Sequence, residues 1–127
     1  MPQQPKPRHS RYAEVEPFTT KDGSTIRELM HPAHHAVRRQ SLAQAAVAPG
    51  CATLLHRHRV TEEVYHITAG RGLMRLGAAT FEVRRGDTVV IAPGTAHNIR
   101  NHGRLPLRIL CACTPAYAHD DTELLEL

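Results

Sequence analysis

Apolar and polar residues alternate along much of this chain in short runs, which is the pattern of half-buried β-strands. Glycine- and proline-rich turns separate the runs at intervals of about ten residues, and no apolar stripe of helical period is long enough for a typical helix. The pattern predicts strands, the first of them a hairpin, at residues 18–30, 40–47, 51–58, 63–67, 73–76, 80–83, 88–91, 97–101 and 105–113. So many short strands indicate an all-β sandwich or barrel.

The same alternation predicts which side chains point into the barrel. In the run 63–67, Glu63, Tyr65 and Ile67 share the inward face, so His66 lies on the outside. The inward face of the last run is apolar and consists of Leu107, Ile109, Cys111 and Cys113. The two cysteines are soft enough to bind a metal, but small buried hydrophobic residues are the simpler interpretation.

The two ends of the chain differ from the rest. Residues 1–12 are polar and contain three prolines, which predicts a flexible leader before a single domain at 13–127. The acidic tail from residue 120 begins like a capped helix and predicts one short helical turn.

Composition excludes several classes of protein. The net charge is +4, but the basic residues are dispersed, and with no Trp there is little to stack on bases, so a nucleic-acid partner is not expected. No stretch approaches the ~20 apolar residues of a membrane span. An odd count of three cysteines argues against a disulfide framework and favours the reducing cytoplasm.

One short segment carries the clearest chemistry. His56 and His58 lie two residues apart, so a strand turns both imidazoles to the same face, and Glu63 follows five residues later. Two imidazoles and a nearby carboxylate are suitable ligands for a divalent metal. A second group of histidines, at 31, 34 and 35, lies in a loop without a matching acid, so we do not expect a metal there.

Two spaced patterns extend this segment. The first runs from Gly50 through His56, His58 and Glu63 to Gly70. The second runs from Gly86 through the turn Ala92-Pro93-Gly94 to His97 and Asn101, after a spacer of only fifteen residues, 71–85. Together they resemble the two signature motifs of the cupin superfamily, at 50–70 and 86–101, with the short spacer of compact microbial members. Ala92 stands where the family usually has proline, which affects the turn and no ligand.

The resemblance implies a double-stranded β-helix, the jelly-roll barrel. It also implies that His56, His58, Glu63 and His97 hold one divalent transition metal, which could be Fe, Mn, Ni, Zn or Cu. Asn101 matches the position that supports the turn. N-terminal strands that pack on a partner subunit in similar small cupins imply a homodimer.

The surroundings of the metal predict a pocket for a small molecule. Tyr65 shares the face of Glu63 and is the candidate to donate a proton or a hydrogen bond. Leu42, Gln44 and Ala46 share a face, and Gln44 is either an inward donor or, more simply, a surface residue. The expected apolar wall consists of Ala52, Leu54, Ile99 and Ile109.

These features favour a metal-dependent enzyme of the oxygenase, decarboxylase, lyase or isomerase type. Its substrate would be a small anionic or oxygenated organic molecule, because the ion and one carboxylate together carry a formal charge of about +1. Four ligands leave two positions open on an octahedral ion but none on tetrahedral zinc. A non-catalytic module that binds a small ligand or only the ion remains the alternative, and a regulator's sensory domain would need a separate DNA-binding chain.

Overall fold

The computed structural model describes residues 5–126, and nearly all of its regular structure is β-strand. One sheet has the order β1 (Phe18–Thr19), β2 (Thr25–Met30), β3 (Ser41–Val47), β10 (Leu107–Thr114), β5 (Glu62–Ala69) and β8 (Thr88–Ile91). The other has the order β11 (Thr122–Leu124), β4 (His56–His58), β9 (His97–Arg100), β6 (Arg71–Leu76) and β7 (Ala79–Arg84). The only helices among the described residues are two 3-10 turns, η1 (Tyr12–Glu14) and η2 (His119–Asp121).

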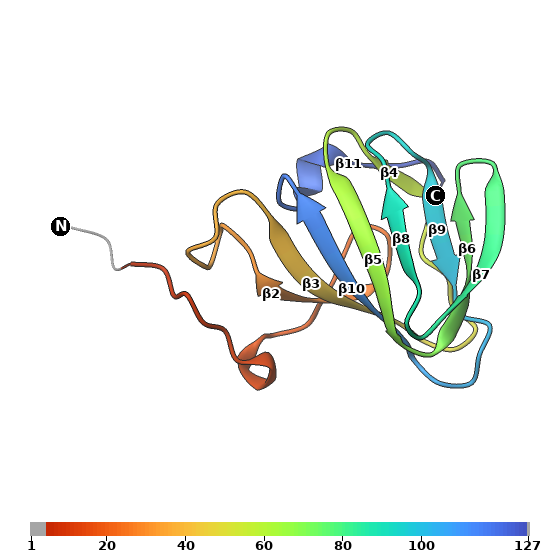
Figure 1. Ribbon diagram of the computed structural model, residues 1–127, viewed down its shortest axis with the longest axis horizontal. Helices are drawn as coiled ribbons and strands as arrows, with labels where there is room; N and C mark the ends of the chain where they lie inside the picture. The colour runs from red at the N-terminus through yellow and green to blue at the C-terminus, as the bar shows by residue number, and fades with distance from the viewer. Residues whose placement is uncertain (1–4, 127) are drawn as a thin grey trace.

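The two sheets face each other and enclose the core, as a jelly-roll barrel does (Figure 1). Every strand pair is antiparallel, and sequence neighbours often lie in different sheets, so the chain crosses between sheets repeatedly. The all-β prediction and the jelly-roll architecture are therefore confirmed. No helix in the described part of the chain is long and apolar enough to cross a membrane.

Pairing between β10 and β5 divides the barrel interior into two zones. Ile109 lies opposite Ile67, whereas Cys113 lies opposite Glu63 at the other end of the same pair. The apolar zone contains Val47, Ile67, Met74, Val83, Ile99, Leu107 and Ile109, all nearly inaccessible to solvent. The interior therefore changes from hydrocarbon to polar groups along the strands, and the polar end contains the candidate site.

Gly70 closes the tight connection between β5 and β6. Its φ is +82°, in the left-handed region that glycine adopts without strain. A Cβ at this position would lie 2.8 Å from the carbonyl oxygen of Pro106, which belongs to the segment before β10. Glycine here thus provides both the turn and the close approach of two backbones.

Residues 5–16 lie outside the barrel, beside β2 and β3 (Figure 1). Ser10 Oγ donates to the Leu29 carbonyl oxygen, and the Tyr12 hydroxyl donates to Gln44 Oε1 at 2.6 Å. The first four residues of the predicted leader lie outside the described residues, and its flexibility and the domain boundary at residue 13 stay predictions.

The structure decides between the two alternatives for Gln44 and corrects the prediction for the tail. The interior face of β3 consists of Ser41, Ala43, Ala45 and Val47, so Gln44 points outward and the surface interpretation was right. The tail has its short turn, η2, but continues as β11, a strand that the acidic composition did not reveal. β11 forms because its backbone pairs with β4, an interaction that local sequence does not encode.

Candidate metal centre

Two neighbouring strands bring three imidazoles together at the polar end of the barrel. β4 carries His56 and His58 on its inward face, and β9 places His97 directly opposite His56. All three side chains are buried, and one ring nitrogen from each lies within 4.8 Å of the other two. Three potential metal ligands therefore converge on one point because of the strand periodicity and the pairing register.

Hydrogen bonds fix the orientation of each ring. Nδ1 of His56 donates to the carbonyl oxygen of Leu54 at 2.7 Å, and Nδ1 of His97 donates to that of Thr95 at 2.9 Å. A carbonyl oxygen only accepts, so both rings carry the proton on Nδ1 when neutral and leave Nε2 as a lone pair.

The third ring is held by β11. Nδ1 of His58 lies 3.1 Å from the Thr122 hydroxyl oxygen, and that hydroxyl donates its own proton to the Ala118 carbonyl. Thr122 must then accept from His58, so the third Nε2 is also an unprotonated lone pair. Outer partners of this kind orient metal-binding histidines in many proteins.

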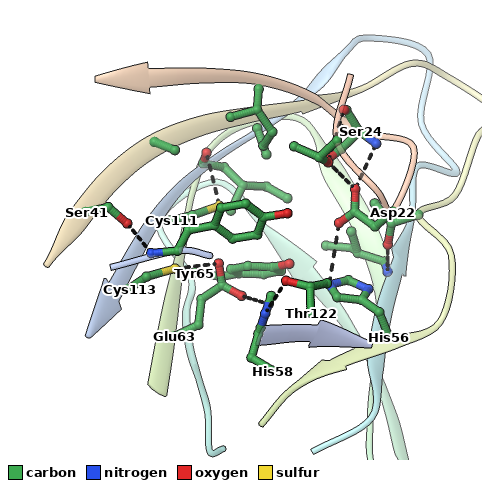
Figure 2. A pocket seen from close by; sticks show the side chains of 18 of the residues that line it. Asp22, Ser24, Ser41, His56, His58, Glu63, Tyr65, Cys111, Cys113 and Thr122 are labelled. Carbon is green, nitrogen blue, oxygen red and sulfur yellow. Dashed lines mark hydrogen bonds and ion pairs between the residues drawn. The ribbon is translucent and has the colours of Figure 1, made fainter. Parts of the chain in front are cut away.

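Glu63 approaches two of the three imidazoles from the opposite sheet. Its Oε1 lies 3.2 Å from Nε2 of His58 and 3.7 Å from Nε2 of His97. Its Oε2 accepts a hydrogen bond from the Cys113 thiol at 3.3 Å. Figure 2 shows His56, His58 and Glu63 pointing into one cavity.

This arrangement fits a cation. Oε1 of Glu63 and Nε2 of His97 are buried without a hydrogen-bond partner among the described residues. Three imidazole lone pairs and one carboxylate oxygen face one another, and an unpartnered buried acceptor is costly. A divalent ion bound to all of them would remove that cost, and nitrogen and oxygen donors suit first-row transition metals.

Burial has opposite effects on the protonation of two groups at the site, His97 and Tyr65. Desolvation, together with the neighbouring His56, lowers the pKa of His97 to about 4. Burial raises the pKa of the Tyr65 phenol well above its ordinary value, and the nearby charge of Glu63 adds to this effect. His97 is therefore ready to bind a metal, while Tyr65 keeps its proton and can donate a hydrogen bond.

The cavity beside the imidazoles is narrow, with a volume of about 40 Å³. This is room for about three water molecules. Its polar wall includes Tyr65, Cys111, Cys113, Ser41 and Tyr117, and its apolar wall includes Ile26, Ala43, Ala45, Val47, Ile99 and Ile109. Among the described residues no lysine or arginine lines the cavity, so it lacks the charged donors that commonly bind a phosphate group.

The expected apolar wall was half right. Ile99 and Ile109 line the cavity, but Ala52 and Leu54 do not, and Thr53 takes their place. The regular strand begins only at residue 56, so the alternation of inward and outward side chains cannot be extended back from His56 to residues 52–55. Thr53 turns inward because its hydroxyl accepts the Ile99 amide hydrogen at 3.0 Å.

Two other sequence predictions, for His66 and Asn101, are met. His66 points away from the cavity and contacts the Thr88 hydroxyl at 2.8 Å. The side-chain amide of Asn101 donates to the carbonyl oxygens of Val47 and Leu105, which holds the turn. In the histidine loop, both ring nitrogens of His31 already have backbone partners.

Sequence reasoning missed two acidic residues at the cavity. Asp22, in the turn between β1 and β2, has Oδ2 3.5 Å from Nε2 of His56. Glu28, on β2, also lines the cavity, and burial raises its pKa. No local signal marks either residue. The segment 21–24, which contains Asp22, looks like an ordinary hairpin turn.

The fold and the convergent histidines define a small β-barrel protein with a candidate metal centre. The family model for the cupin domain matches residues 43–113, more than half of the chain. The chain therefore belongs to the cupin family, as its motifs predicted.

Two known proteins are similar to this chain over most of its length. An uncharacterized protein of Methanocaldococcus jannaschii is 53% identical over 115 residues, which cover 91% of this chain and 92% of that protein. The tetracenomycin polyketide synthase protein TcmJ of Streptomyces glaucescens is 26% identical over 108 residues, 81% of this chain and 72% of that one.

Solved structures show the same fold. A predicted oxalate decarboxylase of Thermotoga maritima superposes with a TM-score of 0.72 at 22% identity, over 83% of this chain and 96% of that one. Oxalate decarboxylase of Bacillus subtilis gives 0.77 at 25% identity over 91% of this chain, which spans about a third (31%) of that longer protein.

Proposed function

We propose that this cupin binds one divalent transition metal through His56, His58, His97 and Glu63, and acts as a metal-dependent enzyme on a small oxygen-bearing molecule. The observation that carries this proposal is the convergence of three Nε2 lone pairs on one point inside a buried cavity. An ion bound there would supply Lewis acidity toward a carboxylate, enolate or phenolate oxygen.

The side chains around that point have separate roles in the proposal. Tyr65 keeps its proton at neutral pH and would donate a hydrogen bond to a substrate oxygen. Ile99 and Ile109 would exclude water from the substrate's carbon atoms. The small cavity restricts the substrate, or the part of it that enters, to a few non-hydrogen atoms.

The names of similar proteins support the same class of substrate. One curated relative is a tetracenomycin polyketide synthase protein, and the similar solved structures include an oxalate decarboxylase. Both names denote oxygen-rich compounds, a polyketide and a dicarboxylic acid. We infer an oxygenase, decarboxylase, lyase or isomerase reaction on a molecule of this kind.

A screen of the metal-loaded protein tests the proposal. Purified protein is loaded in turn with iron, manganese and nickel and incubated with small carboxylic acids, diols and phenols, while the spectrum of the ion is recorded. We expect at least one compound to perturb the spectrum and be turned over, and His58→Ala to do neither. If no compound has either effect, the enzymatic proposal fails.

A non-catalytic binding module is the second candidate. It is favoured by the scarcity of groups that can exchange protons, because burial raises the pKa of Tyr65, Cys111 and Cys113 alike. Spectral perturbation by a compound without turnover would favour this function over the enzymatic one.

We further infer a homodimer in a reducing compartment. A row of apolar residues crosses the outer face of the six-stranded sheet, formed in register by Met30, Leu42, Ala112, Val64 and Val90. Such a row is suited to a second copy, and light scattering of the purified protein would give the mass. The three cysteines are all free thiols, which suits a reducing environment.

A further inference from the structure

We propose that Asp22 is a fifth protein ligand of the metal, contributed by the N-terminal hairpin. This inference rests on the proposed metal centre and adds a second carboxylate to it. Figure 2 shows Asp22 above His56, on the side of the cavity away from Glu63.

The hairpin turn is fixed in place over the barrel. The backbone oxygen of Asp22 accepts from the Leu54 amide at 2.8 Å, just before β4. Lys21 Nζ donates to the carbonyl oxygen of Thr122 at 2.8 Å, on β11. Gly23 completes the turn with a φ of +91°. The turn is thus anchored beside β4, which carries His56 and His58, and to β11, whose Thr122 orients His58.

One oxygen of Asp22 is fully occupied by its own turn. Oδ1 accepts hydrogen bonds from the Thr20 hydroxyl at 2.7 Å, the Ser24 amide at 2.9 Å and the Ser24 hydroxyl at 2.6 Å. These bonds hold the carboxylate in one orientation. They leave Oδ2 directed at Nε2 of His56, 3.5 Å away.

The close approach of Asp22 Oδ2 to His56 Nε2 brings two hydrogen-bond acceptors face to face. Nδ1 of His56 donates to Leu54, so Nε2 of the neutral ring is a lone pair that faces the carboxylate oxygen. Two acceptors held together in a largely buried site repel each other unless a cation lies between them. The same relation holds between Nε2 of His97 and Oε1 of Glu63 on the other side. One ion bound to all five groups removes both repulsions.

A second carboxylate changes what the centre can bind. Two carboxylates give a divalent ion a formal net charge of about zero, so anions lose most of their electrostatic attraction. Five protein ligands leave a six-coordinate ion one free position. The centre would then accept a single oxygen donor, and a bidentate acid would have to displace Asp22.

The competing explanation is an ion pair, in which His56 carries a second proton on Nε2 and donates it to Asp22. The two explanations predict opposite effects of Asp22→Asn, which keeps the acceptor oxygen for Ser24 but removes the charge. Loss of a ligand weakens metal binding. Loss of an ion pair lowers the proton affinity of His56 and leaves metal binding unchanged or tighter.

The experiment measures Co²⁺ binding by calorimetry and by the visible spectrum of the bound ion. The variants are Asp22→Asn, His58→Ala, and Asp87→Asn as a control at an exposed turn, where Asp87 caps the Arg84 amide. We expect Asp22→Asn to raise the Kd by about tenfold or more and to alter the Co²⁺ spectrum, with no change for Asp87→Asn.

Other outcomes separate the two proposals. Unchanged or tighter Co²⁺ binding by Asp22→Asn, with binding lost in His58→Ala, overturns the role of Asp22 and leaves the metal centre. Full binding by His58→Ala overturns both. A crystal structure of the Co²⁺-loaded wild type provides a test that does not depend on a variant's folding. Oδ2 of Asp22 should lie about 2.1 Å from the ion, and an Asp22 oxygen outside the coordination sphere refutes the proposal.

Discussion

At the scale of single residues, the direction of each side chain decides the chemistry. His58 and His66 are both histidines in or beside the first motif, but only His58 faces the cavity. The direction of the Cys113 side chain matters in the same way, because it lets the thiol reach Oε2 of Glu63 from the neighbouring strand.

Replacement of the two histidines should have unequal effects. We expect His58→Ala to remove most of the bound metal, because it deletes one of three convergent Nε2 atoms. We expect His66→Ala to keep the wild-type metal content, because its ring points away from the cavity and its side-chain hydrogen bond is to Thr88. Elemental analysis of the two purified variants provides the measurement, and equal loss would refute the face assignment.

The Cys113 thiol should matter as a hydrogen-bond donor. Burial and the charge of Glu63 raise the pKa of Cys113, so it stays protonated and can hold Oε2 while Oε1 faces the imidazoles. We expect Cys113→Ala to raise the metal Kd by about tenfold, and Cys113→Ser to restore most of the affinity. Cys51→Ala, at an exposed thiol, is the matched control. Identical affinities for all three variants would show that the thiol has no such role.

At the scale of elements, pairing across the barrel matters more than local preference. β4 is only three residues long, yet it is held on one side by β9 and on the other by β11. β11 also supplies Thr122, which orients His58. The composition of the tail favours a helical turn, but β11 forms a strand because β4 offers unpaired backbone groups at its edge.

Two glycines allow backbone strain to be separated from steric conflict. Gly70 and Gly50 have similar φ angles of +82° and +78°, but only at Gly70 would a Cβ meet another atom within 4 Å. We expect Gly50→Ala to cost about 1 kcal/mol from the left-handed conformation alone. Gly70→Ala should cost at least about 2 kcal/mol, because Pro106 would have to move. Chemical denaturation of both variants measures the difference, and equal costs would contradict the close approach.

At the scale of the whole molecule, the candidate metal centre lies between the two sheets of the barrel. Its candidate ligands come from the hairpin turn, β4, β5 and β9, which belong to both sheets. An ion bound to all of them would link the two walls at their polar end. Membership of the cupin family agrees with the fold but does not identify the reaction, which has to be determined from the site.

Metal removal should therefore lower the stability of the folded protein. Free metal at a hundred times its Kd stabilises the native state by about 2.7 kcal/mol, or roughly 10 °C in Tm for a domain of this size. We expect a chelator to reverse that increase in the wild type and to have no effect on His58→Ala. Calorimetric scans with and without the chelator test this, and a chelator-insensitive Tm in the wild type would count against a bound ion.

The motif spacing and period-two alternation were enough to predict the all-β class, the cupin family and the candidate ligands His56, His58, Glu63 and His97. Alternation is a local property, and inside a regular strand it determines the face of every residue. The tertiary structure alone revealed Asp22, Thr122 and Thr53 at the site. These residues lie in a turn, a late edge strand and an irregular segment, and their positions depend on which backbones pair across the barrel rather than on their neighbours in sequence.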